Sequence, residues 1–149
     1  MVETEIVVRY AETDKMGIVH HSNYFIWFEA GRTELIRKTG ISYSEIEKSE
    51  GVYLPLISCG CDFKKPCFYE DRLKIRTKIH SLKPSRIRFY YEVLKNDIVC
   101  ATGYTEHAFV DKNFKPVNLE KKNKELFVLF QKLFEEDISN TQNSLTSLK

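Results

Sequence analysis

The chain has 149 residues, a formal net charge of +2 at pH 7 and a pI near 8.3. This length is ordinary for one domain that buries its own core without disulfide or metal staples. The nearly balanced charge gives no case for a nucleic-acid-binding protein, so we expect small-molecule or protein partners.

The first residues, Met1 to Glu5, lack the basic and apolar blocks of a signal peptide. No apolar run reaches the ~20 residues that a membrane span requires. We therefore expect a cytoplasmic protein without a membrane span. Thiols in apolar or strand-like segments of a cytosolic protein are more often small buried side chains than halves of disulfides, which applies to Cys59, Cys61, Cys67 and Cys100. The Cys59-Gly60-Cys61 run lacks the two-residue spacer of common zinc pairs, so no metal site is expected.

The predicted elements begin with a short β-branched strand over residues 5–10, followed by a loop to residue 22. Residues 23–38 carry apolar side chains on almost all sides of the first two turns, which is typical of a helix enclosed by other structure. Ser22 or Asn23 can cap this helix, and Gly40 can end it. Gly31 lies in its interior, where glycine costs roughly 1 kcal/mol relative to alanine, and so predicts that another backbone passes close by.

A second helix is predicted over residues 43–50, because Ser42 and Glu45 have the spacing of a capping box and Gly51 follows the end. Residues 52–63 predict a strand. Alternation of apolar and polar side chains over 73–80 and 86–93, and the segment 98–110, predict half-buried antiparallel strands. The tripeptides at 83–85 and 95–97 predict the turns between them.

Apolar residues at helical spacing over 119–136 predict an amphipathic terminal helix. The polar segment 138–149 has a composition typical of a disordered tail. We therefore expect one domain over residues 1–137, with no internal repeat or linker.

The most informative stretch runs from Tyr10 to Tyr24 and reads Y-A-E-T-D-K-M-G-I-V-H-H-S-N-Y. In it, Asp14 lies on a glycine-containing turn that leads into the start of the first helix. A helix start leaves backbone N–H groups without partners and carries the positive end of the macrodipole, so it favours an oxygen that gains negative charge. A carboxylate beside such a helix start provides the base or nucleophile and the charge stabilisation that acyl hydrolysis needs.

The order of predicted elements looks like the hotdog fold, an α+β fold in which a five-stranded antiparallel sheet wraps around a long central helix. Residues 10–24, continued by 28–34, resemble the signature of the 4-hydroxybenzoyl-CoA thioesterase family. The closer likeness is to its branch of small bacterial acyl-CoA thioesterases, including those associated with the Tol-Pal system. The resemblance implies that Asp14 is the catalytic carboxylate and that the backbone N–H of His21 polarises the thioester carbonyl.

The resemblance further implies an acyl-CoA substrate, no cofactor, since CoA is part of the substrate, and a homodimer or homotetramer with the active site between subunits. Expected substrate-binding residues near Asp14 are Gly17, Ile18, His20, Asn23 and Tyr24. Expected contacts with the CoA phosphates are Lys64, Lys65, Lys83, Arg86 and Arg88. The same basic residues also suit a solvated strand face, which is the usual place for such side chains.

Several alternatives stay open at this level. Asp14 alone could be an ordinary turn residue, but the neighbouring residues at the family's spacing favour the catalytic interpretation. Asp14 could activate water or attack the carbonyl itself, and we favour the general base. Another branch of hotdog enzymes uses a helix glutamate, but we expect Glu29 to lie on the helix interior side and to pair with Arg32 or loop N–H groups. Ser22 lacks the Gly-x-Ser-x-Gly pattern of a nucleophile. Hydrolysis of acyl carrier protein thioesters, or acyl binding without catalysis, would suit the same fold.

Overall fold

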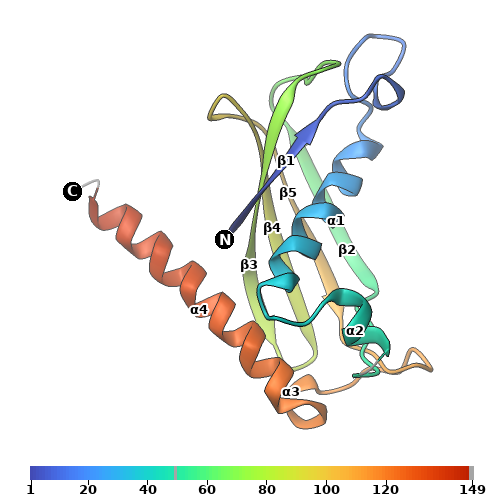
Figure 1. Cartoon of the computed structure of the whole chain (residues 1–149), viewed down its shortest axis with the longest axis vertical. Coiled ribbons are helices and arrows are strands. Elements are labelled where there is room, and N and C mark those ends of the chain that lie inside the picture. The colour runs from blue at the N-terminus through green and yellow to red at the C-terminus, as the bar shows by residue number, and fades with distance from the viewer. Residues whose placement is uncertain (49, 148–149) are drawn as a thin grey trace.

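The computed structural model describes residues 1–48 and 50–147. Its strands are β1 (Val2–Val7), β2 (Leu56–Phe63), β3 (Arg72–Lys83), β4 (Arg86–Lys95) and β5 (Ile98–Ala108). They form one antiparallel sheet of five strands in the order β1-β3-β4-β5-β2. The long helix α1 (Ser22–Arg37) lies against one face of this sheet, mainly over β3 and β1 (Figure 1). The expected α+β architecture, a sheet around a long helix, is therefore confirmed.

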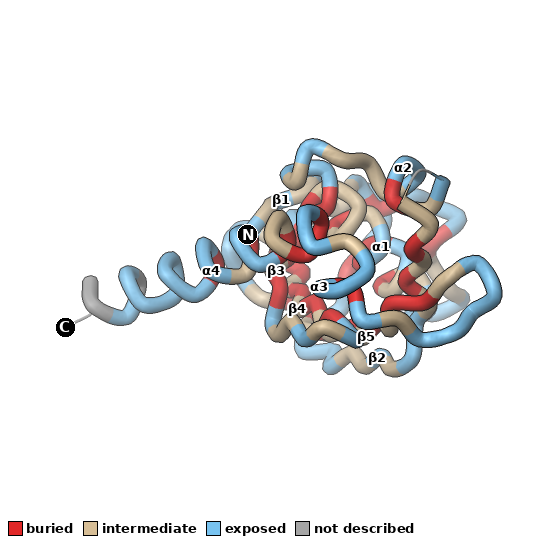
Figure 2. The backbone as a smooth tube through the Cα atoms, turned by 90° about the horizontal axis from the view of Figure 1, so that it is seen from below, coloured by how far each residue is buried: buried red, intermediate tan, exposed pale blue. Residues whose placement is uncertain are grey.

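Glycine allows α1 to lie directly on the sheet. Gly31 is buried, and a Cβ built on it would overlap the hydroxyl oxygen of Thr77 on β3 and lie 3.3 Å from Ile75 Cγ2. Phe28, one turn earlier on α1, stacks on Tyr91 of β4 with ring centroids 4.3 Å apart and planes 9° apart. The close approach that Gly31 predicts is thus an approach to the sheet, and Figure 2 shows buried residues where α1 and the sheet face each other.

The hairpins follow the turn residues of the sequence. Asn96 and Asp97 both have positive φ, 50° and 65°, as the two central residues of a type I′ turn require, and they join β4 to β5. Pro84 and Ser85 join β3 to β4, where Lys83 pairs with Arg86. Both predicted turns are confirmed.

The first two predicted strands differ most from the structure in where they begin. The first strand is Val2–Val7 rather than 5–10, because pairing with β3 ends at Val7 and a 3-10 turn, η1 (Tyr10–Glu12), follows. The strand predicted over 52–63 begins only at Leu56, since Pro55 lacks the N–H that a ladder needs. Before it, Tyr53 makes an isolated bridge to Val110.

The second helix, α2 (Tyr43–Lys48), has the predicted capping box. Ser42 N–H donates to Glu45 Oε2 at 3.1 Å, and Glu45 N–H donates to Ser42 Oγ at 3.2 Å. The two polar groups therefore satisfy each other's helix-end donors. Ser49, within the predicted range of this helix, lies outside the described residues.

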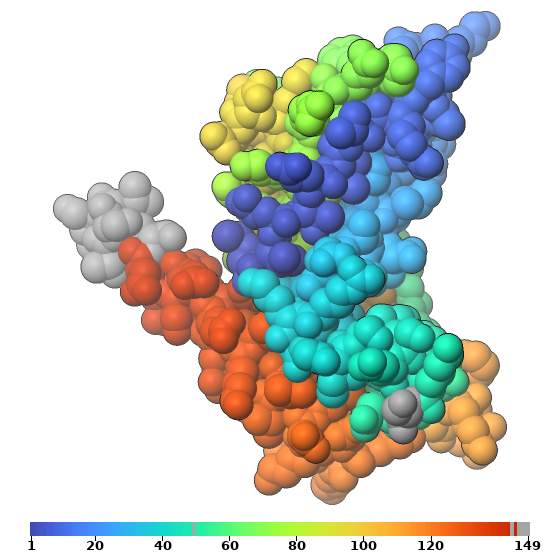
Figure 3. Space-filling model, viewed as in Figure 1, coloured from blue at the N-terminus to red at the C-terminus, as the bar shows by residue number. Residues whose placement is uncertain are grey.

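The terminal segment corrects one expectation. After α3 (Leu119–Lys122), helix α4 spans Lys124–Ser147 and includes residues 138–147, which we expected to be disordered. Asp137 is buried where α4 crosses β3: its Oδ2 accepts from Ile79 N–H at 3.0 Å, and Oδ1 binds the Met1 ammonium group. Thr141 Oγ1 then donates to the Asp137 carbonyl at 2.9 Å. Amino-acid composition cannot predict these contacts, which support the continuation of α4 beyond residue 137. The outer turns of α4 stand away from the rest of the molecule (Figure 3). Residues 148–149 lie outside the described residues.

None of the helices described in residues 1–48 and 50–147 combines the length and apolar character needed to cross a bilayer.

Candidate active site

The loop between β1 and α1 folds back on itself and presents Asp14 on a tight turn. Asp14 N–H donates to the Ile18 carbonyl at 2.8 Å, and Gly17 N–H donates to the Asp14 carbonyl at 2.9 Å. Gly17 has φ +85°, a conformation that explains why glycine occupies this position. The Asp14 side chain is half-buried, and its Oδ1 accepts from Met16 N–H at 2.8 Å. Its Oδ2 has no hydrogen-bond partner among the described residues, so one oxygen holds the rotamer and the other is available to a ligand.

The start of α1 lies beside this turn. His21 is the N-cap residue, with helical φ −54° and ψ −32°, and its side chain makes no capping hydrogen bond. The expected cap from Ser22 or Asn23 is therefore wrong. His20 N–H donates to the Glu12 carbonyl at 2.9 Å, whereas the next N–H, that of His21, has no acceptor among the described residues. An unpartnered N–H at the positive end of a helix of 16 residues can stabilise an oxyanion.

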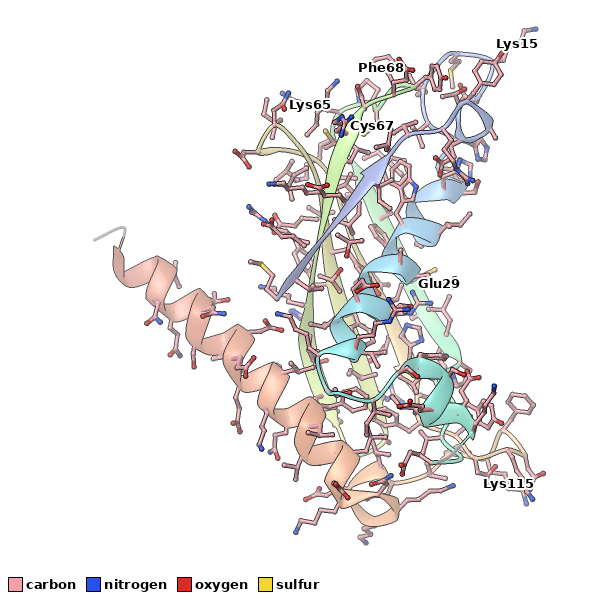
Figure 4. All side chains as sticks on the ribbon, in the orientation of Figure 1. Lys15, Glu29, Lys65, Cys67, Phe68 and Lys115 are labelled. Carbon is pink, nitrogen blue, oxygen red and sulfur yellow. The ribbon has the colours of Figure 1, made fainter. Side chains whose placement is uncertain are left out.

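Both groups line one cleft of about 410 Å³. Its other walls are apolar or basic side chains from the loop, from α1 and from the segment after β2: Met16, Ile18, Val19, Tyr24, Phe63, Lys64, Lys65 and Pro66. The structure therefore brings together the predicted site residues Asp14, Ile18, His21, Tyr24, Lys64 and Lys65. Figure 4 shows Lys15, Lys65, Cys67 and Phe68 at this end of the molecule.

Tyr24 lines the cleft and is hydrogen-bonded to the buried thiol of Cys67. Burial, together with a hydrogen bond to Cys67, raises the pKa of Tyr24 well above its usual value. Burial likewise raises the pKa of the Cys67 thiol to about 12. At neutral pH both groups are therefore uncharged, and Tyr24, with Phe63 packed edge-on at 4.9 Å between ring centroids, gives the cleft an aromatic wall. Cys59, Cys61, Cys67 and Cys100 are free thiols in the structure.

Three predicted substrate contacts shape the loop and do not line the cleft. Gly17 forms the Asp14 turn, as described above. His20 Nδ1 lies 2.8 Å from Ser22 Oγ and accepts from Ser22 N–H at 3.3 Å. Asn23 Nδ2 donates to the carbonyl oxygens of Glu12 and His20, at 2.9 and 3.2 Å. Of the two adjacent histidines, only His21 lines the cleft.

The five basic residues fall into two separate groups. Lys64 and Lys65 line the cleft, whereas Lys83, Arg86 and Arg88 lie toward the far end of the β3–β4 hairpin. β3 has 12 residues and is roughly 36 Å long at about 3.3 Å per residue. Its first residue is the end nearer the cleft, because Phe68, just before β3, bridges the cleft residue Ile18. One protomer therefore does not place all five around one ligand.

Arg86 and Arg88 already have partners on the sheet. Both pair with Glu106, at 3.9 and 3.2 Å, and the Arg88 guanidinium lies 4.5 Å from the Tyr104 ring centroid. The interpretation of these two arginines as part of a solvated strand face fits these contacts.

Glu29 differs from expectation. It is exposed rather than on the interior side of α1, and it makes no ion pair with Arg32 among the described residues. It lies midway along α1, away from the loop that carries Asp14 (Figure 4). Glu29 does not line the cleft. Within this protomer, Asp14 is therefore the carboxylate that lies beside the free N–H of His21.

Sequence reasoning missed Phe63, Pro66, Glu12 and Trp27. Phe63 and Pro66 flank the two cleft lysines along the chain. Their position next to Lys64 and Lys65 is the sequence feature that could have identified them as cleft residues. Glu12 is buried and accepts from Trp27 Nε1 at 2.9 Å. No spacing rule pairs residues 15 apart across a loop and a helix, so this contact had no signal in the sequence.

Comparisons with known proteins show the family of this chain. The model of the thioesterase-like superfamily matches residues 8–127. YneP of Bacillus subtilis, which carries the provisional name acyl-CoA thioesterase, is 39% identical over 119 residues, covering 78% of this chain and 86% of YneP. A 1,4-dihydroxy-2-naphthoyl-CoA hydrolase of Synechococcus is 27% identical over 117 residues, covering 75% of this chain and 78% of that protein.

A solved structure is similar over almost the whole chain. The DHNA-CoA thioesterase of Staphylococcus aureus superposes with a TM-score of 0.86 at 33% identity, covering 93% of each chain. The fold expected from the sequence, the hotdog fold, is therefore confirmed. The family match covers most of the chain, including the Asp14 loop, α1 and the sheet from β2 to β5. The chain belongs to the thioesterase-like superfamily and has its hotdog fold.

Proposed function

We propose that this protein hydrolyses the thioester of an acyl-CoA to a free acid and CoA, with Asp14 as general base and the His21 backbone N–H as oxyanion donor. The reaction class is a thioester hydrolase, as the superfamily and the named relatives confirm. The acyl-CoA substrate, the roles of the two residues and the 4-hydroxybenzoyl-CoA or Tol-Pal-associated branch belong to the proposal. One observation carries it: Asp14 and His21 line the same cleft, and neither Asp14 Oδ2 nor the His21 N–H has a hydrogen-bond partner among the described residues.

The proposed reaction uses these two groups in one sequence. Asp14 accepts a proton from water as the water oxygen attacks the thioester carbon. The carbonyl oxygen becomes an oxyanion, which accepts a hydrogen bond from His21 N–H and is favoured by the helix dipole. The intermediate then collapses, the C–S bond breaks, and the CoA thiolate leaves and takes up the proton. Thiolate is a good leaving group, so a base and an oxyanion donor are sufficient, and the proposed mechanism uses no cofactor.

The surroundings of the cleft support a CoA ester. Lys64 and Lys65 give its rim positive charge, which suits the phosphates of CoA, while Phe63 and Tyr24 give it an apolar wall for the acyl group.

The resemblance implies a homodimer or homotetramer, and we further propose that two copies associate through β2. β2 is the last strand in the sheet order, and it carries Leu56, Ile57 and Phe63, which are 52%, 47% and 52% exposed. An edge strand with large exposed apolar side chains is a template for pairing with another chain. Sedimentation equilibrium is expected to give a dimer or tetramer mass, and a monomer at micromolar concentration would contradict this assembly.

The test is hydrolysis of a panel of aliphatic and aromatic acyl-CoA esters, followed by release of free thiol. The Asp14→Asn variant keeps the shape but cannot act as a base, so we expect kcat to fall by a factor of about 100 or more. Asp111→Asn is the matched control, because Asp111 Oδ1 also accepts turn N–H groups, from Asn113 at 2.8 Å and Lys115 at 3.0 Å, but far from the cleft. Near-normal turnover by Asp14→Asn would remove Asp14 from the mechanism. Acyl carrier protein thioesters in the same assay test the other carrier, and binding without hydrolysis would favour a non-catalytic role.

A further inference from the structure

Glu12 is a charged side chain that the proposed mechanism does not use, although it is buried beside the site. It is 3% exposed, and both its carboxylate oxygens are occupied. Oε1 accepts from Arg9 N–H at 2.8 Å and lies 3.4 Å from Arg9 Nε, and Oε2 accepts from Trp27 Nε1–H at 2.9 Å. The carboxylate thereby connects the start of the loop to the second turn of α1.

The main chain of Glu12 reaches the other two parts of the loop. Its carbonyl oxygen accepts from His20 N–H and from Asn23 Nδ2–H, both at 2.9 Å. The loop closes between these contacts, with a bridge between residues 13 and 19 and the Asp14 turn at its tip. Glu12 thus lies two positions before Asp14 in the chain. It is also hydrogen-bonded to His20, the residue immediately before His21.

Trp27 is a firm anchor for this connection. Its side chain is 2% exposed, and its ring packs on Tyr24 with centroids 4.9 Å apart. Tyr24 in turn packs edge-on against Phe63, so the anchor is continuous with the aromatic wall of the cleft.

The contacts of the Glu12 side chain require a carboxylate rather than an amide. A buried charge is tolerated only when hydrogen bonds satisfy it, and two N–H donors fix both oxygens here. An amide of the same shape would place an NH₂ group against one of those donors. The position therefore favours a carboxylate over its neutral isostere, and the geometry of the loop depends on that charge.

We infer that Glu12 is a positioning residue for thioester hydrolysis: through Trp27 and Arg9 it holds Asp14 and the His21 N–H at the separation that the reaction requires. This inference rests on the proposed function. Glu12 does not line the cleft and touches no reacting atom, so its effect is expected in kcat rather than in substrate binding.

The first test is the Glu12→Gln variant with the best acyl-CoA of the panel. We expect kcat per folded molecule to fall about tenfold or more, with KM within about threefold of the wild-type value, because small misplacements of catalytic groups are costly. Circular dichroism gives the folded fraction. The Trp27→Phe variant keeps an aromatic ring but removes the donor to Oε2 together with part of the ring, so it gives a second measurement if Glu12→Gln folds poorly. It is expected to lower kcat in the same direction, and the double variant should be no worse than the more affected single variant.

A spectroscopic signal reports the contact independently of turnover. Trp27 is the one tryptophan of the 149-residue chain, so its indole N–H gives a single resonance in a ¹⁵N–¹H correlation spectrum. Loss of the carboxylate acceptor in Glu12→Gln is expected to shift that proton resonance upfield.

Glu45→Gln is the matched control, because Glu45 makes the same kind of return hydrogen bond, to Ser42 N–H at 3.1 Å, on α2. It is expected to leave kcat, KM and the indole resonance unchanged. Wild-type kinetic constants in Glu12→Gln would overturn the inference, as would a kcat loss in Glu12→Gln that Trp27→Phe does not share. A wild-type protein that hydrolyses no thioester of the panel would instead contradict the proposed function.

Discussion

Gly31 of α1 lies against Thr77 of β3 so closely that the helix has no room for a methyl group at this position. The Thr77 hydroxyl is buried and has no hydrogen-bond partner in the part of the chain that the structure describes. The contact sets the distance between α1 and the sheet, and with it the position of the helix start that carries His21.

The Gly31→Ala substitution is therefore expected to destabilise the protein. Overpacking a close contact costs about 1–3 kcal/mol, which exceeds the gain in helix propensity of roughly 1 kcal/mol. Thr77→Ala removes the overlapping oxygen, so the double variant Gly31→Ala with Thr77→Ala should recover much of the loss. Urea unfolding of the four proteins measures this cycle. Purely additive effects would show that the Thr77 hydroxyl is not the obstacle.

The general-base role of Asp14 predicts where solvent oxygen goes. In a single turnover in ¹⁸O-labelled water, the label should enter the released acid and not the enzyme, because water attacks the thioester directly. A nucleophilic Asp14 would form an anhydride, and its hydrolysis could leave label in the Asp14 carboxylate. Mass spectrometry of the peptide that contains Asp14 distinguishes the two, and label in that peptide would overturn the general-base assignment.

The split of the basic residues predicts which of them binds CoA. Changing Lys64 and Lys65 together to glutamine should raise KM several-fold with kcat nearly unchanged. The two lysines line the cleft, but the proposed mechanism gives them no part in the chemical step. The effect should shrink at high salt, because exposed charges are screened. Lys121 and Lys122 on α3 provide a matched pair of adjacent lysines at the other end of the molecule. An equal rise in KM in that control pair would indicate a general charge effect rather than a site.

A buried chain of hydrogen bonds predicts a pH dependence of stability. Tyr91 Oη lies 2.6 Å from Thr105 Oγ1, which lies 3.0 Å from His107 Nε2, and His107 Nδ1 lies 2.9 Å from the Leu54 carbonyl. With Nδ1–H donating to the carbonyl, a neutral ring can accept from Thr105 and satisfy every group. Burial, opposed in part by the Leu54 carbonyl, lowers the pKa of His107 to about 4.

The sign follows from linkage. Between the unfolded pKa of about 6.5 and the folded value near 4, the unfolded chain binds more protons, so stability falls as the pH decreases through this window. At about 1.4 kcal/mol per pKa unit, His107 accounts for up to about 3 kcal/mol between pH 7 and pH 4. His107→Asn cannot titrate, so the free energy of unfolding should depend less on pH in this variant. Parallel pH profiles for the variant and the wild type would contradict this assignment, and carboxylate titrations common to both cancel in the difference.

The candidate site shows how far residue patterns reach. The Asp14 turn, its glycine and the approaching helix start follow from local chemistry, because each depends on residues within a few positions in the chain. The capping box of α2 and both hairpin turns are local in the same sense, and they are confirmed. The first strand and the cap of α1 were wrong in detail, since the partner strand and the loop contacts decide where pairing stops and what Asn23 binds.

The sequence by itself determined the element types, the hotdog family and the pairing of an acidic turn with a helix start, because periodicity, turn residues and a contiguous motif are properties of neighbouring residues. Only the tertiary structure decided which basic residues share the cleft, that Glu29 is exposed, that Glu12 binds Trp27, and that Asp137 anchors α4 to β3. Each of these depends on contacts between segments far apart in the chain, and burial and hydrogen bonding at such contacts are settled by how the elements pack rather than by any local pattern.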